Sequence, residues 1–395
     1  MNVILFDDPE NRVNLLPFTF VRPVSALRVG IMTLAEKWEK ALGTDVSYLT
    51  QDYLQEKFPL QAGSDNLYIN ASVCPNSELV DRIHKLKEGQ CLMWKDELLA
   101  VRTMEHFRDP SEVSATKYVQ KDIVITPVII RYPWDIFINT RNQIIADFPV
   151  VTEGRKSAPI EDRFTVVYGE ENIFVEEGAS IRAAILNAEK GPIYIGKGAE
   201  IHEGSVIRGA CSIGEGTKIN MSAKVHEDCS FGPYCKVGGE VSNSVFQGYS
   251  NKGHDGFLGN SVLAEWCNLG ADTNTSNLKN NYGEVKVWNY KTRNLIETGQ
   301  MFCGLMMGDH SKAGINTMFN TGTVVGVSAN IFGGGFPDKH IPSFAWGGIE
   351  DTVTADFDKM CEVATAVMGR RHVDFTEVDR QILKRVFEIT ALDRN

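Results

Sequence analysis

The stretch from Ile195 to Lys236 decides the fold, because written in sixes it reads IGKGAE, IHEGSV, IRGACS, IGEGTK, INMSAK, VHEDCS and FGPYCK. The first place is always large and apolar, and Val237 continues the series. The fifth place is always small: Ala199, Ser205, Cys211, Thr217, Ala223, Cys229 and Cys235. Two independent rules kept over successive units indicate a structural repeat. A unit of this length suits one short strand and a corner, with its first and fifth residues turned inward. Three units then close one triangular coil, and coils stack through parallel strands.

A second run begins at Met307 with MGDHSK, AGINTM, FNTGTV and VGVSAN, followed by Ile331. Two stretches interrupt the repeat, at residues 238–257 and 274–302. The first overlaps SNKGHDGFLGN, residues 250–260, which is rich in turn-forming residues around His254 and predicts a loop. The second is too long and polar for a coil and predicts a loop or small hairpin. Insertions in repeat proteins gather on one face, often the binding face.

The rest of the chain predicts two further domains. Residues 1–155 read as an α/β domain with a mostly parallel sheet: strands at NVILF and NLYIN, helices over 25–42 and 76–89, and a hairpin over 90–104. Residues 156–350 hold the repeat, and residues 351–395 carry two helical patterns, the second capped by Thr376. We expect these helices to pack on the end or side of the coils.

Composition narrows the classes of function. The net charge of -11 argues against nucleic acid or an anionic membrane as the main partner. No apolar run approaches a membrane span, and the N-terminus lacks the features of a signal peptide, which predicts a cytoplasmic protein. The eight cysteines form no CxxC pair, so we expect reduced thiols and no structural zinc. Those in the repeat, Cys211, Cys229 and Cys235, are expected to pack as small core residues.

The sixfold pattern resembles the hexapeptide-repeat family, which implies a left-handed parallel β-helix, an exception to the usual right-handed crossover. An α/β domain followed by such a solenoid is similar to the bifunctional sugar-1-phosphate nucleotidyltransferase/acetyltransferases of the GlmU type. The resemblance is specific in the solenoid, in NKGHDGFLGN at 251–260, NLGADTNTSN at 268–277 and AGINTMFNTGTVVG at 313–326.

The resemblance implies roles for individual residues. His254 matches the catalytic base, which takes a proton from an attacking amine, and a histidine suits this task at neutral pH. Phe257 and Asn277 match residues that contact the sugar. The nearest cations are Arg208, Lys236 and Lys252, and Lys252 is the candidate among them for binding the substrate. Ala271 and Ile315 match backbone positions that contact acetyl-CoA or another acyl-CoA, in a homotrimer whose sites lie between adjacent solenoids. The family's sugar-phosphate clamp is replaced by neutral residues, Asn220 and Ser242 or Asn243.

Other histidines offer alternatives. A loop histidine often only caps a turn, and this interpretation of His254 stays open. His310, in GDHSK, is a weaker candidate at a corner of the repeat. His202 and His226 occupy the second place of their units and are expected to be plain surface residues.

The N-terminal domain resembles a divergent nucleotidyltransferase. The family's Gly-rich loop is missing, but Pro17-x-Thr19 and Arg22-Pro23 resemble its later signatures. The resemblance makes Arg12, Arg22 and Arg28 candidates for holding phosphates, and ordinary surface salt bridges are the alternative. Asn70 stands where the family has a metal-binding Asp. Asp135 and Asn139, in WDIFINTRNQI, are the candidates for Mg²⁺ binding with an NTP.

Together these observations predict an enzyme of sugar-nucleotide metabolism. The β-helix would transfer an acyl group from acyl-CoA to a sugar phosphate or sugar nucleotide, and the N-terminal domain would transfer a nucleotidyl group to a sugar 1-phosphate. Two alternatives remain. One is nucleotidyl transfer alone, with the β-helix as a trimerisation stalk. The other is a non-catalytic scaffold that binds sugar nucleotides.

Overall fold

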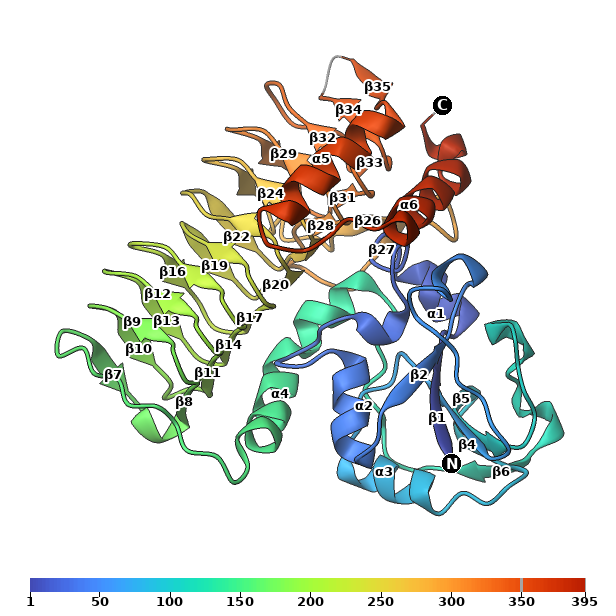
Figure 1. Ribbon diagram of the computed structural model, residues 1–395. Coiled ribbons are helices and arrows are strands. Elements are labelled where there is room, and N and C mark those ends of the chain that lie inside the picture. The colour runs from blue at the N-terminus through green and yellow to red at the C-terminus, as the bar shows by residue number, and fades with distance from the viewer. Residues whose placement is uncertain (349–350, 395) are drawn as a thin grey trace. The chain divides into compact units, whose positions relative to one another are not determined.

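The computed structural model describes residues 1–348 and 351–394 (Figure 1). The chain forms two compact units, residues 1–27 with 32–135, and residues 28–31 with 136–395. The division falls at the start of helix α4 (Pro133–Thr152), N-terminal to the boundary expected at residue 155. Helix α4 belongs with the second unit because its buried Ile144 packs against Ile31 and against Ala210 of the coils.

The first unit is built on a six-stranded sheet in the order β2-β1-β3-β5-β4-β6. Only β5 runs antiparallel to its neighbours, so the predicted mostly parallel sheet is confirmed. The NVILF strand is buried from its second residue onward, as expected for a strand covered on both faces. The strands are β1 (Asn2–Phe6), β2 (Val46–Leu49), β3 (Asn66–Asn70), β4 (Gln90–Trp94), β5 (Glu97–Thr103) and β6 (Val119–Asp122). The helices are α1 (Pro9–Asn14), α2 (Leu34–Leu42) and α3 (Ser77–His84).

The helix predicted over residues 25–42 is wrong in its first half. Helix α2 begins only at Leu34, because Thr33 and Glu36 form a capping box that defines its first turn. Gly30 has a φ of +94°, which no helical residue adopts. Residues 24–26 form a short 3₁₀ turn instead, and the chain between this turn and α2 is irregular.

The second unit is a parallel β-helix, confirming the predicted fold. Its coils contribute strands to three long sheets, and each coil pairs with the next in parallel (Figure 1). The first places of the sixfold repeat, from Ile195 to Val237, are at most 2% exposed, and the small fifth places are fully buried. The eight cysteines are free and buried. The first sheet holds β7 (Val166–Tyr168), β10 (Ile185–Asn187), β13 (Val206–Arg208), β16 (Lys224–Val225), β19 (Glu240–Ser242) and β22 (Phe257–Gly259).

The other two sheets are longer. The second holds β8 (Ile173–Val175), β11 (Ile193–Ile195), β14 (Cys211–Ile213), β17 (Cys229–Phe231), β20 (Val245–Gly248), β23 (Val262–Glu265), β28 (Met306–Met307), β31 (Val324–Val325) and β33 (His340–Ile341). The third holds β9 (Ser180–Ile181), β12 (Glu200–Ile201), β15 (Lys218–Ile219), β18 (Lys236–Val237), β21 (Asn251–Lys252), β24 (Asn268–Leu269), β29 (Lys312–Ala313), β32 (Asn330–Ile331), β34 (Ala345–Gly347) and β35 (Thr352–Thr354). A separate pair joins β25 (Asn274–Thr275) to β30 (Met318–Phe319).

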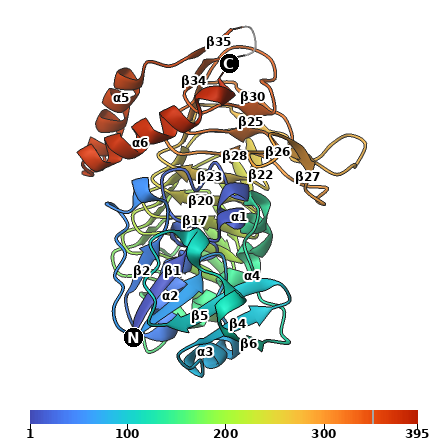
Figure 2. The same ribbon diagram turned by 90° about the vertical axis from the view of Figure 1, so that its right-hand side faces the viewer.

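Both interruptions of the repeat appear in the coils. Cys211 pairs with Cys229 at the regular spacing, whereas Ser230 pairs with Val245 and Val245 with Val262, so these coils are shorter. The predicted second insertion contains a hairpin of β26 (Lys286–Asn289) and β27 (Asn294–Glu297), which extends away from the coils (Figure 2).

Two helices follow the coils, α5 (Phe357–Gly369) and α6 (Glu377–Ile389), and Thr376 caps the second as predicted. They pack against the coils, since Arg371 Nη2 donates to Asn251 Oδ1 at 3.1 Å and Arg394 Nη1 donates to the Ser343 carbonyl at 3.3 Å. Within the part of the chain that the structure describes, no helix combines the length and apolar character needed to cross a membrane.

Candidate functional site

His254 lies in an exposed bend between β21 and β22, where the coil is shortened. The strand before it is in register with the next two coils, because Asn251 pairs with Asn268 and Asn268 with Lys312. Three residues further along each coil stand His254, Ala271 and Ile315. The structure therefore stacks the predicted base and the two predicted coenzyme contacts at one corner of three successive coils, and we call these three residues the corner row.

Backbone hydrogen bonds hold the corner row together. The Asp272 amide donates to the Asp255 carbonyl at 3.1 Å, and the Asn316 amide donates to the Ala271 carbonyl at 2.8 Å. The side chain of Ile315 is 70% exposed, unusual for an isoleucine in a folded protein. The row thus presents an exposed imidazole beside an exposed apolar side chain and backbone edge.

Lys252 supports this corner from inside the coil. Its side chain is fully buried, and its ammonium donates to the carbonyls of His254 and Asp255. Burial lowers the pKa of Lys252 to about 8, and the nearby Asp255 and Asp272 oppose this shift. The predicted contact of Lys252 with substrate is replaced in the structure by two contacts with the bend that carries His254.

Phe257 and Asn277 lie together on the neighbouring strand segments. A Cβ placed on Gly259 would come within 2.6 Å of both Phe257 Cζ and Asn277 Nδ2, so both side chains cover this glycine. Asn277 Nδ2 donates to Asn260 Oδ1 at 2.8 Å. Asn220, at the position of the missing clamp, donates from Nδ2 to the Gly253 carbonyl at 2.7 Å. Asn220 therefore holds the backbone of the bend, a role that the identity of this residue in the sequence did not predict.

The remaining histidines have other surroundings. His310 is 9% exposed and stacks on Trp266, with ring centroids 6.3 Å apart. His202 Nε2 lies 3.1 Å from a carboxylate oxygen of Glu200, and His226 Nε2 lies 3.1 Å from one of Glu240. Among the histidines of the repeats, His254 is thus the one on the corner row.

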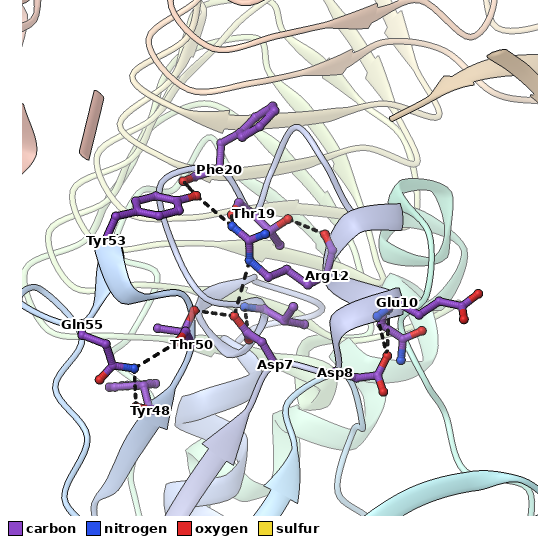
Figure 3. Close-up of polar contacts among 12 residues, drawn as sticks. Asp7, Asp8, Glu10, Arg12, Thr19, Phe20, Tyr48, Thr50, Tyr53 and Gln55 are labelled. Carbon is purple, nitrogen blue, oxygen red and sulfur yellow. Dashed lines mark hydrogen bonds and ion pairs between the residues drawn. The ribbon is translucent and has the colours of Figure 1, made fainter. Parts of the chain in front are cut away.

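In the first unit, polar side chains gather where β1 and β2 end (Figure 3). Asp7 follows β1 directly and is fully buried. Thr50 Oγ1 donates to its Oδ2 at 2.6 Å, the Val24 amide donates to its Oδ1 at 2.8 Å, and Arg12 Nε lies 3.9 Å from Oδ2. Burial raises the pKa of Asp7 to about 6, although Arg12 and Thr50 oppose the shift.

Arg12 forms hydrogen bonds with several residues of the same region. Its Nη2 donates to the Thr19 carbonyl at 3.0 Å and to Tyr53 Oη at 2.8 Å, and Tyr53 Oη donates to the Phe20 carbonyl at 2.7 Å (Figure 3). The guanidinium predicted to hold phosphates is therefore buried against the loop that replaces a Gly-rich turn. Asp7, Thr50 and Tyr53 were not singled out from the sequence, because their partners are distant along the chain.

The other predicted residues of the N-terminal half are distributed differently. Arg22 is buried in the first unit, whereas Arg28 belongs to the second, where its amide donates to Gln247 Oε1 at 2.5 Å. Asn70 Nδ2 donates to the Leu98 carbonyl at 3.2 Å, and its Oδ1 accepts from the Ser72 amide at 3.0 Å. The structure therefore does not place the three predicted arginines in one unit.

Asp135 and Asn139 lie one turn apart on α4. Asp135 Oδ2 accepts from the amides of Arg131 and Tyr132 at 2.8 and 2.9 Å, as a capping residue does. Burial raises the pKa of Asp135. No group of three His, Cys, Asp or Glu within residues 1–348 and 351–394 is arranged to hold a metal ion. This geometry gives Asp135 a structural role at the start of α4, and the assignment of Asp135 and Asn139 to Mg²⁺ stays a prediction.

Comparison with known proteins covers part of the chain. Residues 3–156 match the family model described as sugar nucleotidyl transferase. The chain is 35% identical over 102 residues to a bifunctional sugar-1-phosphate nucleotidylyltransferase/acetyltransferase from Sulfurisphaera tokodaii, and 33% identical over 104 residues to a bifunctional protein GlmU from Methanocaldococcus jannaschii. Each match covers 26% of this chain and 25% of the relative, so the chain spans about a quarter of the length of these relatives. The predicted resemblance to GlmU-like sugar nucleotidyltransferases is confirmed over the part that these matches cover.

Solved structures give weaker likenesses. The polySia-specific acetyltransferase NeuO is 10% identical with a TM-score of 0.29, covering 54% of this chain and 97% of that one. The Arabidopsis UDP-N-acetylglucosamine acyltransferase is 13% identical with a TM-score of 0.24, covering 59% and 93%. These scores are too low for either likeness to bear on function.

Proposed function

We propose that this protein is a GlmU-like transferase of sugar-nucleotide metabolism whose β-helix transfers an acyl group from acyl-CoA to an amino sugar that carries phosphate. The observation that carries the proposal is the corner row, which places His254, Ala271 and Ile315 on three successive coils. A backbone edge beside an apolar side chain suits the pantetheine arm of the coenzyme, which offers amides and methylene groups.

The chemistry follows from the position of the imidazole. The amine nitrogen of the acceptor attacks the thioester carbonyl, and His254 takes the proton that the nitrogen releases. The carbon–sulfur bond then breaks, and the departing thiolate takes a proton from the imidazolium. Phe257 and Asn277 lie on the coils next to His254 and are proposed to contact the sugar ring.

The test is a screen of acyl transfer, which follows free thiol released from acetyl-CoA in the presence of amino-sugar phosphates and amino-sugar nucleotides. His254→Asn should lower kcat about 10²–10⁴-fold, the range that general bases contribute. His226→Asn is the matched control, because His226 is also a partly exposed histidine of the solenoid. Unchanged transfer in the His254 variant would remove this residue as the base.

Nucleotidyl transfer by the first unit is the second candidate, and the match of residues 3–156 favours it. The unit would take an NTP and a sugar 1-phosphate and release pyrophosphate. Asp135 Oδ2 accepts two amide hydrogen bonds at the start of α4, and the Mg²⁺ dependence of the reaction tests whether Asp135 and Asn139 also bind the metal. Pyrophosphate release that depends on NTP, sugar 1-phosphate and Mg²⁺, and that survives in His254→Asn, would establish this activity. Its absence across the NTPs would leave the first unit as a binding domain.

The assembly and location complete the proposal. We propose a cytoplasmic homotrimer, in which a neighbouring solenoid covers the corner row. Ile315, in the corner row with His254, has an exposed apolar side chain, which supports a neighbouring solenoid packing against it.

A further inference from the structure

A cationic pocket lies on the third sheet of the solenoid, beside helix α5. The cavity measures ≈ 290 Å³ and is lined by Lys236, Lys312, Arg370 and Arg371, together with Tyr249 and Trp266. Lys236 and Lys312 stand in one column of the sheet, in which Lys236 pairs with Asn251, Asn251 with Asn268, and Asn268 with Lys312. The two arginines follow α5 directly, with Arg370 as its C-cap residue.

The four cations have no carboxylate partner within ion-pair distance among the described residues. The same column shows the contrast, because Lys218 forms an ion pair with Glu200 at 2.7 Å, one coil before Lys236. In the pocket, Lys312 Nζ donates to the His310 carbonyl at 2.9 Å, and Arg371 donates to Asn251. Neutral oxygens therefore satisfy some donors, while the residues that line the pocket include no carboxylate to pair with its positive charge, in a chain of net charge -11.

The four cationic side chains of the pocket repel one another, so a bound anion would stabilise them. Burial lowers the pKa of Lys236, and Arg371, Lys218 and Arg370 lower it further, whereas Glu200 opposes this shift. A helix C-terminus favours nearby cations, which accounts for the two arginines that follow α5. It does not account for the two lysines that the sheet places opposite them. Arginine and lysine together are the residues that bind phosphate groups.

The aromatic side chains that line the pocket limit further which class of ligand it can bind. Tyr234, Tyr249 and Trp266 form a stack, with successive ring centroids 5.5 and 4.2 Å apart, and His310 continues it at 6.3 Å. The ring faces are thus already occupied by one another along the stack. The wall offers ring edges to the pocket, so the pocket is suited to phosphate groups more than to a stacked base.

The distance to the corner row indicates which substrate carries these phosphates. Asn251, Asn268 and Lys312 each precede a member of the corner row by three residues, so their backbones lie no more than about 10 Å from it. A sugar ring joined to a diphosphate spans a separation of this order. In coenzyme A, by contrast, the whole pantetheine arm separates the thioester from the phosphates.

We propose that this pocket binds the phosphate groups of the sugar acceptor, as a sugar phosphate or the diphosphate of a sugar nucleotide. The assignment to the acceptor rests on the proposed acyl transfer at the corner row. It also explains how the protein holds a phosphorylated acceptor although neutral residues replace the family's clamp at Asn220 and at Ser242 or Asn243.

The test is calorimetric titration of the full-length protein with inorganic pyrophosphate, UDP and coenzyme A, each in turn. Lys236→Met and Arg370→Ala should each weaken the binding of pyrophosphate and UDP about tenfold or more, as expected for the loss of a charge-assisted contact. Lys224→Met is the matched control, because Lys224 is an exposed lysine of another sheet, paired with Glu240. Its affinities should equal those of the unmodified protein.

The outcomes separate this proposal from the proposed function. Binding of pyrophosphate and UDP that is absent, or unchanged in both pocket variants, overturns the pocket. Weakened binding of coenzyme A alone overturns the assignment to the acceptor. Where transfer is detected, Lys236→Met should raise the acceptor KM and leave kcat nearly unchanged. Phosphate binding that depends on Lys236 with no acyl transfer to any acceptor would support the pocket and count against the proposed activity.

Discussion

At the scale of single residues, Asp7 is a buried carboxylate whose titration should affect stability. Its pKa of about 6 lies above the unfolded value of about 3.9. Between these pH values the folded protein keeps a proton that the unfolded chain has released, so this group's stabilising contribution falls as pH rises from 4 to 6.

We therefore expect the unmodified protein to lose up to about 3 kcal/mol of unfolding free energy relative to Asp7→Asn between pH 4 and pH 7, at 1.36 kcal/mol per pKa unit. Urea denaturation of both proteins at four pH values in this range measures the difference. A difference that is independent of pH would show that Asp7 ionises in the folded protein as it does in water.

Lys252 is the second residue with a specific consequence, because its ammonium holds the bend of His254 from inside. Lys252→Met keeps the buried volume and removes both contacts with the carbonyls. We expect amide exchange at Asp272 and Glu240, whose N–H groups donate to the bend carbonyls of Asp255 and Gly256, to rise at least tenfold. The midpoint of denaturation should change little, since the desolvation of a charge is relieved as well.

A positioning role for Lys252 also predicts a kinetic result. In Lys252→Met the kcat of acyl transfer should fall, while the KM for acetyl-CoA is retained, because Ala271 and Ile315 are unchanged. Lys224→Met serves again as the control. Unaltered exchange at the bend would show that the neighbouring coils hold it without the lysine.

At the scale of elements, the coil depends on the small residue at the fifth place of each unit. Cys229 is fully buried, and it pairs in register with Cys211 of the preceding coil. Cys229→Leu should overfill this corner and lower the unfolding free energy by about 1–3 kcal/mol. Cys229→Ala removes only the sulfur and should cost less. Thermal denaturation compares the two variants, and a leucine variant as stable as the alanine variant would contradict this packing.

The elements also show what the sequence could and could not predict. The coil strands and the second C-terminal helix were predictable because their causes are local: a period of six and the Thr376 cap. The start of α2 was missed because the apolar pattern continues upstream of Thr33. The capping box at Thr33 sets the N-terminus of the helix at Leu34. The contacts of Asp7 with Thr50 and Val24 were not predictable, because they join segments that only the folded sheet brings together.

In the candidate site, too, some features were predictable from the sequence and others were not. The alignment of His254 with Ala271 and Ile315 was implied by a family resemblance, and strand register places the three at one corner. The register depends on coil lengths that the interrupted repeat hides. The cationic pocket was not predictable either, because its arginines follow α5 and its lysines come from separate coils.

At the scale of the whole molecule, the proposed trimer has a direct measurement. Light scattering during size-exclusion chromatography should give three times the chain mass of 43.9 kDa. Ile315→Asp should shift the distribution towards smaller species, because it places a charge on the surface that a neighbouring solenoid is proposed to cover. A single-chain mass for the unmodified protein would contradict a site shared between solenoids.

The central claim is that the corner row is where acyl-CoA reacts, and a structure determined with bound coenzyme A tests it most directly. We predict that the pantetheine arm runs along the backbone at Ala271 and Ile315 and that its sulfur lies within reach of His254. Coenzyme bound elsewhere, with its sulfur far from this imidazole, would contradict the account.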